Sequence, residues 1–168
     1  MTRSGAIRAV SAAVVAVAAS AAMQPMAAAA GPPPPTFPGG VACPFALNIT
    51  QTGTPSAWKY FRDKNGTIVR GLLAGNGVDL LFENYDTHAT LALKANGAVN
   101  HATYNPDGSQ TWMTTGHNVL ILFPTDVPVG PSTTYYVGRV VFTVDPQGNF
   151  TMQSTAGNST DICAALSG

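Results

Sequence analysis

Turn signals recur along most of this 168-residue chain, at intervals too short for long helices. Combinations of Asn, Asp, Pro and Gly separate short apolar segments, and Asn-Gly favours tight hairpins because both residues tolerate positive φ angles. The clearest turns lie at residues 63–66, 75–77, 96–97, 105–108 and 145–148. Turns spaced by about 8–12 residues, with no helical periodicity between them, are typical of antiparallel all-β domains. The sequence therefore predicts a single antiparallel β-sandwich or β-barrel of about 8–9 strands.

The apolar segments between these turns are the predicted strands. They lie at residues 57–61, 67–73, 78–83, 89–94, 98–104, 110–115, 117–123, 133–144 and 150–154, and residues 160–166 are predicted to form one helical turn. Alternation in segment 133–144 predicts a core face of Tyr136, Val140, Phe142 and Val144 and a wetter face of Thr133, Tyr135, Val137 and Arg139. Residues 119–123 are apolar on both faces, which favours a sandwich slightly over a barrel.

The N-terminal segment has the pattern of a secretory signal peptide. Arg3 and Arg8 precede or begin an uncharged apolar run at residues 9–22, and Ala28–Ala30 supplies the small residues of a cleavage site. We therefore expect a signal peptide at residues 1–30, a Pro/Gly-rich linker at 31–42 and a β domain at 43–168. The protein is expected to be secreted, with the bacterial cell envelope as an alternative location, and to keep no stable membrane anchor after cleavage.

The chain contains two cysteines, Cys43 and Cys163, near the two ends of the expected β domain. An exported protein with two cysteines most simply pairs them, because the compartment is oxidising. We therefore predict a Cys43–Cys163 disulfide. A crosslink that closes so long a loop stabilises the fold by roughly 4–5 kcal/mol in the chain-entropy model.

Charge and motif content argue against several classes of function. Removal of Arg3 and Arg8 with the signal leaves six basic and eight acidic residues, a net charge of −2, so nucleic acid is not an expected partner. His88, His101 and His117 do not have metal-ligand spacing, and the chain has no Gly-x-Ser-x-Gly string. The acidic residues at 107, 126, 145 and 161 are expected to accept backbone hydrogen bonds in turns or near the terminus. No catalytic residue, metal site or cofactor is predicted.

Aromatic and arginine side chains are the remaining candidates for binding. A stacking surface is available to Trp58, Tyr60, Tyr104, Trp112, Tyr135 and Tyr136, although sheet packing also uses such residues. Tyr, Trp and Arg dominate binding hot spots. We therefore predict a ligand- or partner-facing patch formed by Tyr135, Arg139 and Arg70, with Trp112 as its aromatic neighbour. The alternative is that Arg139 forms only a surface ion pair.

Several short motifs together resemble a group of small secreted proteins from high-GC actinobacteria. The motifs are Cys-Pro-Phe at 43–45, Asn-x-Asp-Thr at 84–87, Pro-Asp-Gly-Ser at 106–109, Gly-Arg at 138–139 and Asp-x-Cys-Ala-Ala-Leu at 161–166. His88-Ala89 replaces the Gly-Lys step of that group. The resemblance implies export, a β fold and the disulfide. It implies no activity, because the group has none assigned.

Three classes of function follow from these observations. The leading interpretation is a non-catalytic extracellular module that binds a ligand or a protein. The second is a secreted enzyme with an unrecognised β-barrel active site, which requires a histidine to meet Asp79 or Glu83 in a pocket. The third is a structural protein of the cell envelope or matrix. An aromatic groove favours the first class, a deep polar pocket the second and a bare apolar patch the third.

Overall fold

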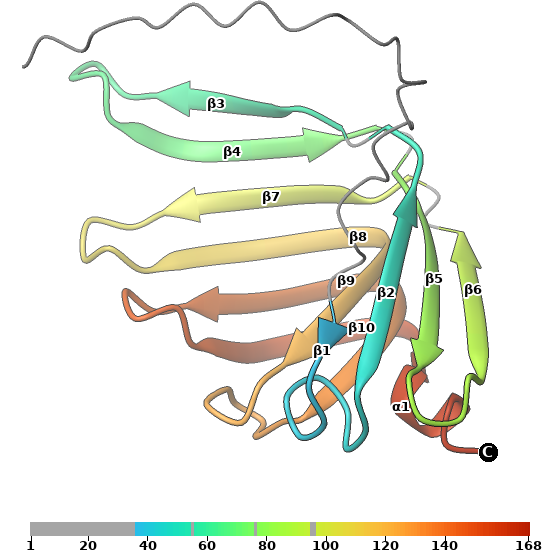
Figure 1. The fold of residues 1–168 in the computed structure, drawn as a ribbon. Coiled ribbons are helices and arrows are strands. Elements are labelled where there is room, and N and C mark those ends of the chain that lie inside the picture. Colours follow the sequence, from blue (N-terminus) through green and yellow to red (C-terminus); the bar gives the residue numbers. More distant parts are fainter. Residues whose placement is uncertain (1–35, 55, 76, 95–96) are drawn as a thin grey trace, which may run out of the picture. The chain divides into compact units, whose positions relative to one another are not determined.

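The computed structural model describes residues 36–168 except 55, 76, 95 and 96, and most of these residues lie in antiparallel β-strands (Figure 1). The predicted signal peptide at 1–30 and residues 31–35 of the predicted linker lie outside the described residues. The elements are β1 (Thr36–Phe37), β2 (Leu47–Thr52), β3 (Trp58–Arg62), β4 (Ile68–Ala74), β5 (Asp79–Asn84), β6 (Thr90–Lys94), β7 (Val99–Tyr104), β8 (Gln110–Leu122), β9 (Ser132–Val144), β10 (Phe150–Asp161) and α1 (Ile162–Ala165).

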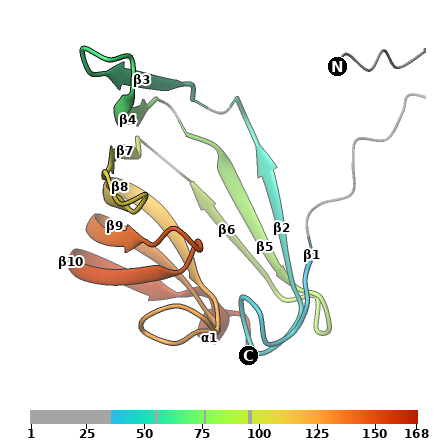
Figure 2. The ribbon, with the colours of Figure 1, turned by 90° about the vertical axis from the view of Figure 1, so that its left-hand side faces the viewer.

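The strands form two antiparallel sheets, with strand order β1-β2-β5-β6 in one and β10-β9-β8-β7-β4-β3 in the other. This arrangement confirms the all-β prediction and decides for a sandwich over a closed barrel. Figures 1 and 2 show the four-stranded sheet crossing one end of the six-stranded sheet. Tight turns at 63–66, 105–108 and 145–148 join neighbouring strands of the large sheet, as the sequence predicts.

Four boundaries differ from the sequence prediction. Strand β2 is missing from the prediction, and β1 and the fully buried Ala42 lie within the predicted linker. The predicted strands 110–115 and 117–123 are one strand, β8, because Gly116 pairs with Gly138 and stays in the ladder. Strand β10 continues to Asp161, since its polar second half pairs with β9 although its local propensity is weak.

Three glycines form a row across the large sheet. Gly116 of β8 pairs with Gly138 of β9, which in turn pairs with Gly157 of β10. Their φ angles are 85°, 151° and 106°, in the region that L side chains rarely adopt. A Cβ at Gly138 would collide with the Ala156 carbonyl oxygen, so the close approach of these strands also requires glycine. The row is therefore the place where three adjacent strands change direction together.

The change of direction is large enough to bring the two ends of β9 together. Strand β9 pairs with the end of β8 at Ser132 and with the start of β10 at Val144. Twelve residue steps of straight strand span about 40 Å. Yet the loop after β8 reaches the start of β10, where the Val127 amide donates to the Phe150 carbonyl at 2.8 Å. Figure 1 shows the β8–β9 hairpin doubling back in this way.

The doubled-back hairpin packs against the main core on one face. Its outer face, with Val119, Ile121 and Tyr135, packs against the main core. That core is built from the small sheet and the C-terminal turn, and its buried members are Ala42, Cys43, Leu47, Ile49, Phe82, Ile162, Cys163 and Leu166. Thr133, predicted on the wetter face, is fully buried and donates its hydroxyl to the Ala42 carbonyl at 2.8 Å. Val140 and Phe142 are buried as predicted.

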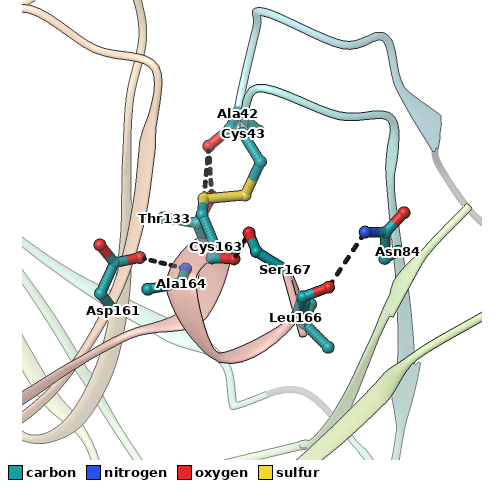
Figure 3. The surroundings of a disulfide bond; sticks show 9 residues. All are labelled: Ala42, Cys43, Asn84, Thr133, Asp161, Cys163, Ala164, Leu166 and Ser167. Atoms are coloured by element: carbon teal, nitrogen blue, oxygen red, sulfur yellow. Dashed lines mark hydrogen bonds between the residues drawn. A yellow bond between two sulfur atoms is a disulfide. The ribbon is translucent and has the colours of Figure 1, made fainter. Parts of the chain in front are cut away.

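The predicted disulfide joins Cys43 to Cys163 and fastens the start of the fold to its C-terminal turn (Figure 3). The Cys163 Sγ lies 3.4 Å from the Ala42 carbonyl oxygen, a contact without a hydrogen because the sulfur is in the disulfide. Asp161 caps α1 by accepting from the Ala164 amide at 3.0 Å. The buried Asn84 amide donates to the Leu166 carbonyl at 3.0 Å. The motif at 84–87 and the motif at 161–166 therefore meet at this junction.

Candidate functional site

A small cavity, called here the corner pocket, lies on the inner side of the bend in the large sheet. Its volume is about 110 Å³. Residues on both sides of the glycine row line it: Trp112 and Thr114 precede Gly116 in β8, whereas Asn118 follows it. Strand β9 contributes in the same way, since Tyr136 precedes Gly138 and Val140 and Phe142 follow it. The bend thus brings two halves of the same strands to face one another.

The chemistry of the corner pocket is aromatic and neutral. Trp112, Tyr136 and Phe142 supply rings, and Asn100, Thr114 and Asn118 supply amides and a hydroxyl. Among the described residues, no charged side chain lines it. Such a mixture of ring faces with a few polar groups is typical of small-ligand pockets.

Asn118 is the notable polar group of the corner pocket. Its Nδ2 atom is buried and has no hydrogen-bond partner among the residues that the structure describes. A buried amide hydrogen without an acceptor costs about 1–3 kcal/mol. Buried donors in folded proteins almost always have an acceptor. A bound ligand with an acceptor oxygen would satisfy the Asn118 amide.

A row of aromatic rings extends from the corner pocket across the large sheet. Phe150 and Phe142 stack at 5.3 Å between centroids, and Phe142 and Trp112 stack at 5.9 Å. Trp112 meets Trp58 edge-on at 5.4 Å, and Trp58 stacks on Tyr60 at 6.0 Å. Phe142, beside the pocket, is 6% exposed, whereas Tyr60, at the far end of the row, is 49% exposed. The row therefore runs from the floor of the pocket to an open aromatic surface.

The structure divides the four predicted patch residues among three environments. Trp112 lines the corner pocket. Tyr135, predicted on a wet face beside Arg139, instead packs on the main core, and its hydroxyl donates to the Lys94 carbonyl at 3.4 Å. Burial raises the pKa of the Tyr135 hydroxyl, in keeping with that position. The alternation rule misplaced Tyr135 because the small sheet covers the face that the rule assigns to solvent.

Arg70 and Arg139 lie on the other face of the large sheet, away from Trp112. Val140 and Phe142 face the corner pocket, so Arg139 points to the opposite side by alternation. Arg70 lines an open hollow on that opposite side. Both arginines are exposed, and neither forms an ion pair with a carboxylate in the described part of the chain. The predicted single patch is therefore wrong as an arrangement: it separates into an aromatic site and a basic face.

The histidines do not gather into a site. His88 adopts φ 60° in the turn before β6, and its Nδ1 lies 2.9 Å from the Glu83 carboxylate at the surface. The hydrogen bond from His88, followed by that from Asn48, lowers the pKa of Glu83. His101 lies on the basic face, and His117 stacks on Tyr135 at 5.8 Å. Within residues 36–168, apart from 55, 76, 95 and 96, no three His, Cys, Asp or Glu side chains are grouped to hold a metal ion.

The turn aspartates have the backbone-bonding role that the sequence predicts. Asp107 and Asp145 accept amide hydrogens within their own turns. The Ser109 hydroxyl and then the Ser109 amide lower the pKa of Asp107, and the Asn149 side chain and then the Asn149 amide lower the pKa of Asp145. Asp126 is 1% exposed and accepts from two amides, those of Phe123 at 2.6 Å and Phe150 at 2.8 Å. It therefore ties the tip of the doubled-back hairpin to the start of β10.

Sequence reasoning missed Asn118 and the contribution of Asn100. The available signal at position 118 was an asparagine directly before residues 119–123, which are apolar on both faces. The chain matches no protein-family model, no curated protein and no solved structure. Among the described residues, no helix has the length and apolar character needed to span a membrane.

Proposed function

We propose that this chain is a secreted, non-catalytic binding module whose ligand site is the corner pocket. The buried, unpartnered Asn118 amide within an aromatic wall is the observation that supports this function best. The glycine row places that amide opposite Trp112 and Phe142 by bending β8 and β9. The Cys43–Cys163 disulfide supports the assignment to an oxidising compartment.

The proposed ligand is a small neutral compound with one ring face and several hydroxyl groups, such as a single sugar unit. A ring face stacks on Trp112, and hydroxyl oxygens accept from the Asn118 amide. The lining residues that the structure describes carry no charge to pair with an ionic ligand. A volume of about 110 Å³ is well below that of pockets for drug-sized ligands, which is why we propose one ring rather than a chain of rings.

Calorimetric titration of residues 31–168 with neutral monosaccharides and cyclic polyols tests this function. The wild-type domain is expected to bind at least one of them with a one-site isotherm. Asn118→Leu removes the donor and keeps similar volume, and it should weaken binding about 2- to 12-fold, the effect of one hydrogen bond of about 0.5–1.5 kcal/mol.

The matched control is Asn158→Leu. Asn158 lies on exposed β10 and outside the lining of the corner pocket, so its substitution should leave affinity unchanged. Equal weakening by both variants, or an Asn118→Leu protein that binds as tightly as wild type, contradicts the proposed site. An Asn118→Leu domain that is markedly less stable than wild type, with no ligand found among these compounds, identifies the amide as purely structural.

A further inference from the structure

The basic side chains of the fold gather on one face of the large sheet, called here the basic face. Lys59, Arg70 and Arg139 lie on it by alternation, and Arg62 lines its open hollow. Lys64 lies in the turn of the same β3–β4 hairpin. These are five of the six lysines and arginines found after residue 30, and the sixth, Lys94, is in β6 of the other sheet.

Acidic side chains are placed elsewhere. Asp126 is buried, Asp161 caps α1, and the turn carboxylates accept backbone amides. Asp63 is the nearest of them to the basic face, and its Oδ1 accepts from the Asn65 and Thr67 amides. A chain whose formal net charge is zero thus presents a face whose side chains are basic or uncharged, which favours an anionic partner.

The basic face also presents an aromatic ring and a line of hydroxyls. Phe61 is 42% exposed and lies under the Lys59 ammonium at 5.5 Å. A row of residues that pair with one another across the six strands of the large sheet begins with Phe61 and Arg70. It continues through four threonines: Thr103, Thr111, Thr143 and Thr151. The open hollow beside this row has a volume of about 780 Å³. Rings, hydroxyls and guanidinium groups are the side chains that bind anionic sugar units.

The spacing of the arginines indicates a long ligand. Three strand steps separate β4 from β9. Thr143 is the residue of β9 that lies in the same row as Arg70, and Arg139 lies four residues before it. With about 4.8 Å per strand step and 3.3 Å per residue, Arg70 and Arg139 are about 20 Å apart. One small anion reaches a single arginine, whereas a linear polyanion reaches both.

We propose that the basic face binds a linear anionic polysaccharide with carboxylate groups. A peptide strand gains little on this face because the backbone groups of β4, β7, β8 and β9 are already paired within the sheet. The proposed polymer lies across the strands, with carboxylates on Arg70 and Arg139 and a sugar ring on Phe61. This site is on the opposite face of the sheet from the corner pocket and does not depend on the function proposed for it.

Binding of the wild-type domain to polygalacturonate, measured by biolayer interferometry, tests the proposal. Arg70→Gln and Arg139→Gln should each weaken binding about tenfold, as expected for loss of one charge-assisted hydrogen bond. Higher ionic strength should weaken it further, because exposed charges are screened. The control Lys94→Gln removes a positive charge from the other sheet and should leave affinity unchanged. Thermal midpoints equal to wild type show that each variant is folded.

Three outcomes overturn the proposal. If the wild-type domain shows no saturable binding to polygalacturonate, the proposed site is ruled out. Equal weakening by Lys94→Gln and Arg70→Gln shows that only overall charge matters. Binding of polyglutamate as tight as that of polygalacturonate shows that the face does not select a sugar polymer. Failure of the monosaccharide titration leaves this test unaffected, because the two sites share no side chain.

Discussion

Asp126 is the side chain on which the doubled-back hairpin depends most directly. It is nearly fully buried, and its two carboxylate oxygens each accept one amide hydrogen. One amide, that of Phe123, belongs to the end of the β8–β9 hairpin, and the other, that of Phe150, belongs to the start of β10. Asp126→Ala leaves both amides without this acceptor, so the tip of the hairpin loses its attachment.

The free energy of unfolding should fall by about 2–4 kcal/mol in Asp126→Ala. Each buried amide without an acceptor costs about 1–3 kcal/mol. Because both bonds are only partly buried, water compensates some of the loss, and the expected sum is in the lower part of the range. Asp126→Asn keeps one acceptor oxygen and should lose about half as much. Asp86→Ala is the control, since Asp86 is exposed and its substitution should cost less than about 0.5 kcal/mol.

Equilibrium urea unfolding, followed by tryptophan fluorescence, measures these differences. Trp112 and Trp58 lie in the aromatic row and report on the packing of the large sheet. A two-state transition with an unchanged m-value and a lower midpoint is expected for Asp126→Ala. A free energy of unfolding for Asp126→Ala within about 0.5 kcal/mol of the wild-type value refutes the reasoning, because the two hydrogen bonds of the carboxylate then contribute little to stability.

Three further predictions concern the glycine row, the disulfide and the turns. Gly138→Ala should destabilise the domain by more than Gly66→Ala, because Gly66 also has a positive φ angle but has open space around it. Equal losses of the free energy of unfolding in urea would show that the clash between strands at Gly138 costs little. Replacing Cys43 and Cys163 by Ser opens a loop of 120 residues and should cost roughly 4–5 kcal/mol relative to the oxidised wild type, and the reduced wild type should be as unstable as the variant. Hydrogen bonds from the Asn149 side chain and then the Asn149 amide lower the pKa of Asp145, so they stabilise the fold at neutral pH. This stabilisation should be lost as the pH falls below 3.8, the ordinary pKa of an aspartate. Asp145→Asn should therefore reduce the dependence of stability on pH in the acid range.

Most strands were predictable because their signals are local. Turn residues with positive φ, such as Gly66 and Gly108, sit where Asn-Gly and Pro-Asp-Gly sequences place them. The disulfide followed from the presence of two cysteines and from the predicted export of the chain. The polar second half of β10 was not predictable in this way, since its strand conformation comes from pairing with β9 rather than from its own residues.

The corner pocket depends on a non-local coincidence that one sequence does not reveal. Gly116 reads locally as a break between two strands, and Gly157 reads as part of a polar tail. Only the register of β8, β9 and β10 aligns them with Gly138 and converts three glycines into one bend. The bend then places Asn118 opposite Trp112, although the two residues are six positions apart on the same strand. Site residues are therefore less predictable than strands in this fold.

The side-chain amide of Asn118 offers the most direct test of the corner pocket. In a ¹H–¹⁵N correlation spectrum of the labelled domain, neutral monosaccharides or cyclic polyols should shift the Asn118 Nδ2 signals in a saturable way. The Trp112 indole signal should move with the same dissociation constant, and the Asn158 amide signals should stay in place. Unshifted Asn118 signals under conditions where other resonances respond to the ligand would contradict the assignment of the corner pocket as the binding site.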